Sequence, residues 1–345
     1  MNECLRQSAL FNTTFQVRYI DFSTSVNIDE VGKFSALKIV KLAALIFNIA
    51  RELLVFRPQL CYISPSMTGW GFYKDCLVAI LLKIFGVPIC YHLHGKTGVK
   101  REQGFINIFL HRIIYNSSHL IVLSERLITN YWFADKAQTI NIVNNGITHN
   151  TRLSVSKKDV PFQVLFLSNM IEEKGPLNVL KVAAIMKGWG IDIRFSFVGK
   201  WADKNLRRAF FNEVRDNDLE GIISFDEGLY GPEKLSKFAD TDVFILPTYY
   251  ANECFPLVIL EAMSFGLPVI TSFEGAIPDI IEDGVNGFLV DPHDPSAMAE
   301  KIKYLANNPE VRKKLGKNAR SKYLNQYTLG IFETNLTNTI NELIN

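Results

Sequence analysis

The chain has 345 residues, of which 48% are hydrophobic and 21% are charged, and its formal net charge is +2. These values predict a globular protein long enough for two domains, and they exclude a disordered chain. Residues 1–150 hold 15 Lys and Arg against 9 Asp and Glu, whereas residues 151–345 hold 22 against 26. The basic first half is suited to anionic lipid, nucleic acid or an acidic substrate, and surface scatter is the alternative.

The five cysteines are widely spaced and form no Cys-x-x-Cys or Cys/His cluster. This spacing favours free thiols in a reducing compartment over a disulfide framework or a zinc site. The first residues show no signal-peptide pattern, so we expect a cytoplasmic protein. The most apolar stretch, residues 36–56, carries four charges. It therefore predicts a largely buried helix with scope for membrane contact, not a spanning helix.

Helix and strand patterns alternate through the first half of the chain. The expected strands are residues 15–20, 60–63, 87–92, 120–123 and 140–143, and the expected helices are residues 36–55, 72–85 and 105–115. Such alternation predicts a doubly wound parallel sheet, which places the chain in the α/β class.

A polar segment, residues 148–160, predicts a linker between an N-terminal domain, residues 1–147, and a second domain, residues 161–323. In the second domain we expect strands at residues 164–167, 194–198, 222–225, 243–246, 269–271 and 287–290. Its helices are expected to start near residues 176, 204, 232, 256, 276 and 295. The tail, residues 324–345, is amphipathic and predicts a further helix.

Two carboxylates, Glu253 and Glu261, stand eight positions apart around an apolar segment. Pro256 suits the first turn of a helix and Gly266 suits its end. We therefore expect Glu253 in the loop before the helix and Glu261 inside it. A carboxylate in an apolar helix needs hydrogen-bond partners, which the hydroxyls of a ribose supply. The alternative is a neighbouring basic side chain or backbone group.

The sequence of residues 253–270, ECFPLVILEAMSFGLPVI, resembles the E-x7-E segment of the retaining glycosyltransferases of family 4. The departure is Cys254, where the family has a small glycine. The resemblance covers residues 87–330 and is strongest over 164–295. It implies the GT-B fold, in which two Rossmann-like domains face a cleft and the C-terminal helix, residues 324–345, crosses back to complete the first domain.

Residues 168–176, SNMIEEKGP, resemble the family's G-R-L-x-x-E-K-G, whose Arg and Lys neutralise the diphosphate of a nucleotide sugar. Lys174 matches the Lys. Asn169 stands in place of the Arg and brings no positive charge. The resemblance therefore implies that the diphosphate depends on Lys174 and on helix N-termini. Backbone N–H groups at the start of the helix after Glu253 are free to bind an anion or a sugar hydroxyl.

The resemblance implies a donor site with further residues from several loops. FVGK, residues 197–200, matches a strand end at which a ligand approaches the backbone, and the base is expected near residues 229 and 230. The complete set of expected donor-binding residues is Asn169, Lys174, Gly199, Lys200, Leu229, Tyr230, Glu253, Cys254, Phe255, Pro256, Leu257, Val258 and Glu261.

In the first domain, YHLHG at residues 91–95 resembles the family's H-G at the cleft rim. The matching residue, His94, joins Glu253 and Lys174 as the expected catalytic residues, and His92 is expected to be structural. Residues 240–242, Asp-Thr-Asp, match the D-x-D motif that binds a metal in another glycosyltransferase fold. By the resemblance, however, they correspond to a segment that holds no metal in family 4. No metal and no cofactor are therefore expected.

Together these features predict transfer of a sugar from a UDP- or GDP-sugar to a hydroxyl, with retention of the anomeric configuration. The expected acceptor is a lipid-linked saccharide in bacterial surface-polysaccharide assembly, on the inner face of the plasma membrane, and no nucleic acid partner is expected. A sugar-nucleotide epimerase on the same fold and a catalytically weak scaffold are the alternatives.

A membrane hypothesis rests on Lys96, Lys100 and Arg101, which run into the apolar residues 105–109. Basic and apolar residues together are typical of an interfacial helix, and the alternative is a core helix with a solvated face.

Family members open with a strand and a glycine-rich loop, whereas residues 1–14 hold neither an apolar strand run nor a glycine. We therefore expect the family's first strand to be missing from the N-terminal domain, with weak or absent turnover. A start site placed too late is the alternative explanation.

Overall fold

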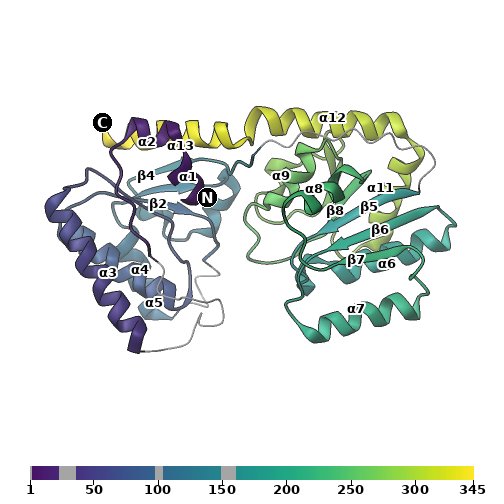
Figure 1. Cartoon of the computed structure of the whole chain (residues 1–345), viewed down its shortest axis with the longest axis horizontal. Coiled ribbons are helices and arrows are strands. Elements are labelled where there is room, and N and C mark those ends of the chain that lie inside the picture. Colours follow the sequence, from purple (N-terminus) through teal and green to yellow (C-terminus); the bar gives the residue numbers. More distant parts are fainter. Residues whose placement is uncertain (1, 23–35, 98–103, 149–160) are drawn as a thin grey trace. The chain divides into compact units, whose positions relative to one another are not determined.

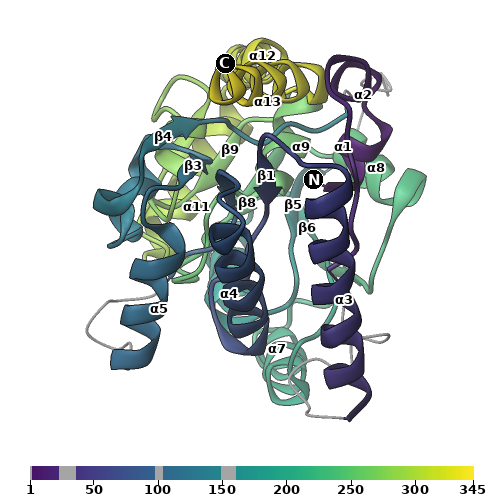
Figure 2. The same cartoon turned by 90° about the vertical axis from the view of Figure 1, so that its left-hand side faces the viewer.

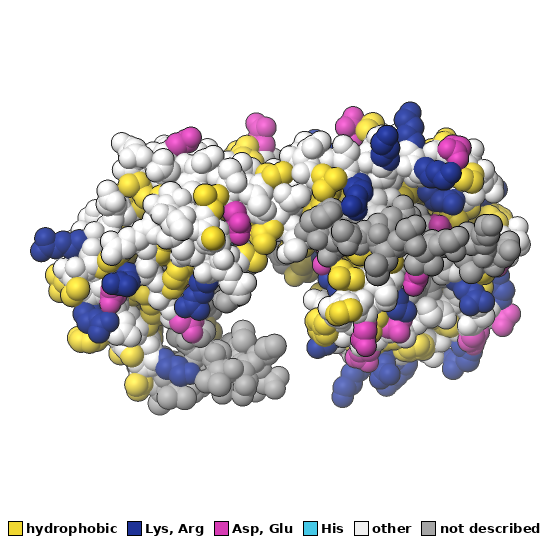
Figure 3. Space-filling view, turned by 45° about the horizontal axis from the view of Figure 1, so that its top comes forward, with side chains coloured by type: hydrophobic (Ala, Val, Ile, Leu, Met, Phe, Trp, Pro, Cys, Tyr) yellow, Lys and Arg dark blue, Asp and Glu magenta, His cyan; other side chains and the backbone are white. Residues whose placement is uncertain are grey.

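The computed structural model describes the chain except for residues 1, 23–35, 98–103 and 149–160. Lys100, Arg101 and nearly all of the predicted linker lie outside the described residues. The chain divides into two compact units (Figures 1 and 3). Unit 1 comprises Met1–Asn144 and Phe332–Asn345, and unit 2 comprises Asn145–Ile331.

The sheet of unit 1 has four parallel strands in the order β1-β2-β3-β4. They are β1 (Cys61–Ile63), β2 (Ile89–Leu93), β3 (His119–Val122) and β4 (Thr139–Ile142). Every residue of β2 and β3 is buried, as expected for parallel strands covered by helices on both faces. Four of the five strands expected in this half are therefore confirmed, with ends shifted by one or two residues.

The strand predicted at residues 15–20 is wrong. Within the described residues, this segment forms no backbone hydrogen bonds with any strand. Half-buried residues, Phe15, Val17 and Ile20, are nevertheless interspersed with exposed Gln16 and Arg18. The alternating pattern therefore marks an extended segment with one half-buried side, and a pattern of that kind carries no information about pairing.

Helices cover both faces of the unit 1 sheet. Tyr91 packs against Tyr115 with ring centroids 4.8 Å apart, whereas the next residue, His92, packs against Phe332 at 6.2 Å. Because successive strand residues point to opposite faces, the helices that hold Tyr115 and Phe332 lie on opposite sides. These are α5 (Phe105–Tyr115) on one side and α13 (Leu329–Ile344) on the other. On the α5 side, α4 (Gly69–Ile84) packs against α5, and α3 (Ala36–Val55) packs against α4 (Figures 1 and 2).

Short helices complete unit 1. They are α1 (Asn2–Gln7), α2 (Ala9–Thr14) and the 3-10 turns η3 (Glu125–Asn130) and η4 (Ala134–Lys136). No helix among the described residues is both long and apolar enough to cross a bilayer.

The sheet of unit 2 has six parallel strands in the order β10-β9-β8-β5-β6-β7. The strands are β5 (Phe162–Leu167), β6 (Ile193–Val198), β7 (Ile223–Asp226), β8 (Val243–Leu246), β9 (Val269–Thr271) and β10 (Gly287–Leu289). All six predicted strands are confirmed, and the chain has the predicted α/β fold with two parallel sheets. The order of the unit 2 strands reverses between β5 and β8, as in a doubly wound sheet, whereas β1 to β4 lie side by side in chain order.

The described helices of unit 2 are η5 (Glu172–Lys174), α6 (Pro176–Gly188), α7 (Lys204–Asp216), α8 (Gly231–Ala239), α9 (Leu257–Ser264), α10 (Ile277–Ile280), α11 (Pro295–Asn307) and α12 (Pro309–Gln326). Six of them start within one residue of the predicted positions, and two, η5 and α12, were not predicted. A further detail differs from the prediction. Pro256 is the N-cap residue of α9 and does not lie within its first turn.

A glycine permits the close pairing of β10 with β9. A Cβ atom added at Gly287 would lie 2.2 Å from the carbonyl oxygen of Val269, which belongs to the neighbouring strand. By contrast, a Cβ added at Gly188, at the end of α6, would meet no atom within 4 Å.

We predict that Gly287→Ala lowers the stability of unit 2 by about 1–3 kcal/mol, because the backbone of β9 must move to accommodate the methyl group. Gly188→Ala should leave stability unchanged or raise it slightly, since Ala is favoured over Gly in a helix. Urea unfolding of the two variants measures both effects, and equal midpoints would contradict the close packing of these strands.

Candidate functional site

The carboxyl ends of the unit 2 strands bring the predicted donor-binding loops to one edge of the sheet. Since the strands are parallel, the segments that follow β5, β6, β7 and β8 all leave at this edge. Open α/β sheets bind ligands at this edge.

An ion pair joins the loops that follow β5 and β8. Lys174 Nζ donates a hydrogen bond to Glu253 Oε2, and the two side chains are only 13% and 9% exposed. The hydroxyl of Thr248 lies 3.4 Å from the same carboxylate oxygen, and the ring centroid of Tyr250 lies 4.8 Å from Lys174 Nζ. Two predicted catalytic residues, 79 positions apart, therefore meet in one nearly buried cluster.

Backbone geometry brings this cluster together. Gly175 has φ of +84°, and a Cβ atom there would lie 2.5 Å from the carbonyl oxygen of Pro247. Beside it, the N–H of Tyr249 donates to the carbonyl of Glu173 at 2.7 Å. Only glycine combines this φ with this close approach, so Gly175 allows Lys174 to reach the loop that holds Glu253.

Glu261 lies on α9 and has a basic partner. Lys234 Nζ, from α8, lies 2.6 Å from Glu261 Oε1, while the other carboxylate oxygen makes no hydrogen bond within the described part of the chain. The Glu261 side chain is 20% exposed, so a ligand hydroxyl can still reach it. Lys234 thus supplies one of the hydrogen-bond partners that the Glu261 carboxylate requires.

The N-terminus of α9 is accessible. Pro256, the N-cap, provides no side-chain cap, and Leu257, the first helical residue, is exposed. Cys254 and Phe255 are buried beneath this turn. The first N–H groups of a helix lack intrahelical partners, so those of Leu257 and Val258 are available for an anion.

A second basic residue lies at the end of β6. Gly199 fits against the loop after β5, since a Cβ there would lie 1.9 Å from the carbonyl oxygen of Ser168. The exposed Lys200 lies 5.2 Å from the ring centroid of Tyr230, and a hydrogen bond with Tyr230 raises its pKa. Asn169 is exposed and Leu229 is half-buried on the neighbouring loops.

His94 follows β2 in unit 1. Its ring lies 4.1 Å from that of His92, and its buried Nε2 atom makes no hydrogen bond within the described residues. Burial lowers the pKa of His94 to about 4 and lowers the pKa of His92 well below its usual value. His92 Nδ1 is hydrogen-bonded to Tyr62 Oη at 2.6 Å, so Tyr62 and His92 support the ring of His94.

Asp240 and Asp242 lie at the opposite edge of the unit 2 sheet, before β8. Asp242 Oδ2 accepts a hydrogen bond from the N–H of Gln163 at 2.9 Å, and Arg312 Nε lies 3.9 Å from its other oxygen. Asp242 therefore links strand β8 to β5. In the described ranges no group of three His, Cys, Asp or Glu residues is arranged to hold a metal ion.

The sequence profile of the family "Glycosyl transferases group 1" matches residues 149–322, half of the chain. The chain belongs to this glycosyltransferase family. Membership agrees with the resemblance to the retaining enzymes of family 4.

Curated relatives of this glycosyltransferase are distant. It is 27% identical over 256 residues to an uncharacterized glycosyltransferase of Methanocaldococcus jannaschii, covering 73% of this chain and 68% of that protein. It is 29% identical to the D-inositol 3-phosphate glycosyltransferase of Corynebacterium kroppenstedtii, with coverage of 74% and 63%. It is also 29% identical to the amylovoran biosynthesis glycosyltransferase of Erwinia amylovora, with coverage of 47% and 41%. The chain thus spans about two thirds or less of their lengths.

Among solved structures, the glycosyltransferase is similar to HepE of Anabaena, crystallised in complex with UDP. The TM-score is 0.74 at 19% identity, and the match covers 88% of this chain and 83% of that one. At this identity, the likeness establishes the GT-B fold.

Sequence reasoning missed several contacts of the predicted residues. Thr248 and Tyr250 contact the Lys174–Glu253 pair, Lys234 pairs with Glu261, and Tyr62 supports His92. Thr248 and Tyr250 lie in the loop after the strand predicted at residues 243–246, a position that could have pointed to them. Nothing in the sequence around Lys234 or Tyr62 indicates that their partners are Glu261 and His92.

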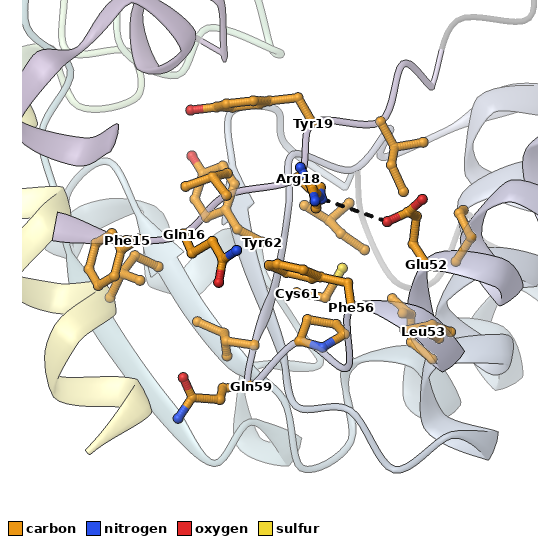
Figure 4. Close-up of a pocket in the computed structure, with 18 of the residues that line it drawn as sticks. Phe15, Gln16, Arg18, Tyr19, Glu52, Leu53, Phe56, Gln59, Cys61 and Tyr62 are labelled. Atoms are coloured by element: carbon orange, nitrogen blue, oxygen red, sulfur yellow. Dashed lines mark ion pairs between the residues drawn. The ribbon is translucent and has the colours of Figure 1, made fainter. Parts of the chain in front are cut away.

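A cavity of about 810 Å³ lies wholly within unit 1, and Tyr62 is one of its lining residues. It runs beside the edge strand β1 and is lined by aromatic side chains that include Phe15, Tyr19 and Phe56 (Figure 4). An ion pair of 3.9 Å between Arg18 and Glu52 stands at its wall.

We predict that His94 makes unit 1 less stable in acid. Because its pKa is about 4 when folded and about 6.5 when unfolded, the unfolded chain binds the proton more readily between these values. The stabilisation is complete above pH 6.5 and is lost as the pH falls to 4. The stability difference between the wild type and His94→Gln should therefore shrink by about 3 kcal/mol from pH 7 to pH 4.

Urea unfolding at a series of pH values measures this difference. Between pH 7 and pH 8 it should stay constant, which provides the internal control. A difference that is also constant down to pH 4 would show that His94 is not held in its neutral form by burial.

Proposed function

We propose that this chain transfers a sugar from a UDP- or GDP-sugar to a hydroxyl group with retention of the anomeric configuration. The observation that carries the proposal is the nearly buried Lys174–Glu253 pair at the carboxyl edge of the unit 2 sheet. A nearly buried cation and carboxylate side by side are suited to a ligand with a diphosphate next to sugar hydroxyls.

The negative charge that develops on the leaving diphosphate requires fixed donors. Lys174 supplies a cation, the exposed Lys200 a second, and the N–H groups of Leu257 and Val258 the start of a helix. Glu253 accepts hydrogen bonds from donor-sugar hydroxyls when the diphosphate engages Lys174. The protein thus contributes positioning and charge stabilisation, and the leaving phosphate accepts the proton of the attacking hydroxyl.

Two further residues complete the proposed machinery. Glu261 binds the ribose with the carboxylate oxygen that Lys234 does not occupy. In unit 1, His94 contributes a neutral ring with a buried Nε2 atom that needs a partner. A neutral imidazole can donate or accept a hydrogen bond without adding charge.

We further propose a lipid-linked saccharide as the acceptor, with the protein at the inner face of the plasma membrane. Support comes from a relative named for amylovoran biosynthesis and from another named for colanic acid biosynthesis. The basic first half of the chain agrees with an anionic membrane partner.

A panel of UDP-, GDP- and ADP-sugars tests the donor class, with protection against thermal unfolding as the readout. We expect protection by UDP- or GDP-sugars, and transfer products whose anomeric protons show retained configuration by NMR. A UDP-sugar converted without an acceptor would indicate an epimerase instead. Protection without any turnover would indicate a binding protein.

We predict that Glu261→Gln weakens nucleotide binding about tenfold or more, because a charge-assisted hydrogen bond to the ribose contributes about 1.5–3 kcal/mol. Calorimetric titration with UDP and GDP measures the change. Glu233→Gln, on the exposed surface of α8, is the matched control and should have no effect. Unchanged affinity in Glu261→Gln would remove this residue from the site.

We predict that Asn169→Arg tightens binding of nucleoside diphosphates by about tenfold or more. Asn169 is exposed on the loop that also holds Lys174, and an arginine there adds a charge-assisted contact to a phosphate. The affinities of the wild type and of Asn169→Arg are measured for UDP or GDP and for UMP or GMP. If all four bind as before, position 169 does not face the phosphates.

A further inference from the structure

Three neighbouring helices of unit 1 expose large apolar side chains. The most exposed described residue of each helix is Val55 on α3, Ile84 on α4 and Phe105 on α5, with 76%, 75% and 82% of their surface accessible. Among the described residues of these helices, the exposed large apolar side chains are Val40, Phe47, Leu54, Val55, Trp70, Tyr73, Leu77, Ile84, Phe105, Ile106 and Phe109. We name these residues the apolar face. So many exposed hydrophobic groups on one layer mark an interaction surface.

The spacing within α3 and α4 aligns these side chains. Val40, Phe47 and Leu54 are seven residues apart, and so are Trp70, Leu77 and Ile84. Seven residues make nearly two helical turns, so each trio lies along one side of its helix. The buried sides of the helices hold other residues, among them Leu45, Ile49, Phe72, Cys76, Ile114 and Tyr115.

The three stripes belong to one layer. α3 packs on α4, and α4 packs on α5, where Phe72 stacks on His111 with ring centroids 4.1 Å apart. All three helices cover the same face of the sheet, and they stand side by side in Figure 2. Side chains that point away from the sheet therefore share one outer surface.

The charges of this layer are predominantly positive. The sequences of α3, α4 and α5 hold six Lys and Arg but two Asp and Glu. Both acids have partners: Glu52 pairs with Arg51, and buried Asp75 accepts a hydrogen bond from the N–H of Ser66 at 2.7 Å.

From this combination we propose that the apolar face docks on an anionic lipid membrane. The apolar side chains enter the boundary between head groups and acyl chains, and the lysines and arginines contact lipid phosphates. Trp70 and Tyr73, with ring centroids 5.9 Å apart, are residue types that favour this boundary. This inference names the surface of unit 1 that would contact the membrane. It rests on the proposed function only in taking the acceptor to be lipid-linked.

Flotation of the full chain with phospholipid vesicles tests the proposal. We expect binding to vesicles of phosphatidylcholine with 30 mol% phosphatidylglycerol, about tenfold weaker binding to phosphatidylcholine alone, and partial loss in high salt. The double variant Trp70→Ser/Ile84→Ser should lose at least tenfold in partition coefficient at both salt concentrations. Salt-insensitive absence of binding to either vesicle overturns the proposal.

A matched pair of variants separates this surface from general hydrophobicity. Leu77 on the apolar face and Leu324 on α12 of unit 2 are 49% and 41% exposed. Leu77→Ser should reduce vesicle binding, and Leu324→Ser should not. If Leu77→Ser and Leu324→Ser reduce vesicle binding equally, the proposal is overturned. It is also overturned if the wild type self-associates in sedimentation and Trp70→Ser/Ile84→Ser abolishes that association. Nucleotide binding needs no lipid, so the donor part of the proposed function is tested independently of vesicle binding.

Discussion

The ion pair between Lys174 and Glu253 is the interaction on which the candidate site depends. It joins two loops that are far apart in the sequence, and the close approach of Gly175 to Pro247 makes it possible. Because both groups are nearly buried, removing one partner would leave an uncompensated charge, at a cost of about 3–5 kcal/mol. The pair is thus a structural requirement of unit 2 before any ligand binds.

The same pair constrains the chemistry of the site. Glu253 neutralises Lys174, and Asn169 adds no charge, so a diphosphate would meet less positive potential than an Arg–Lys site provides. The exposed Lys200 and the N-terminus of α9 are the further positive elements at this edge of the sheet. A donor diphosphate that engages Lys174 would also release the carboxylate of Glu253 for sugar hydroxyls. In the proposed function, binding of the two parts of the donor is therefore coupled through the Lys174–Glu253 hydrogen bond.

Much of this architecture follows from the sequence, and the exceptions have physical reasons. Buried parallel strands are continuous apolar runs, so β8 and β9 were predicted at their observed bounds. The segment 15–20 has the alternation of a strand but no partner, because pairing is a long-range property. Glu261 was expected to need a hydrogen-bond partner, but its partner, Lys234, comes from another helix and no local pattern indicates it. Membrane contact was expected at α5 and allowed for at α3, but not at α4, which looks like a core helix until its neighbours are known.

The central claim is that Lys174 is the cation that binds the donor diphosphate. Calorimetric titration of UDP and UMP into the wild type and into Lys174→Met/Glu253→Gln tests it most directly, because the double variant leaves no buried charge unpaired. We predict that the wild type prefers UDP at least tenfold and that the double variant loses most of this preference, with Lys200 and the N-terminus of α9 accounting for what is left. An undiminished preference for UDP in the double variant would contradict the account.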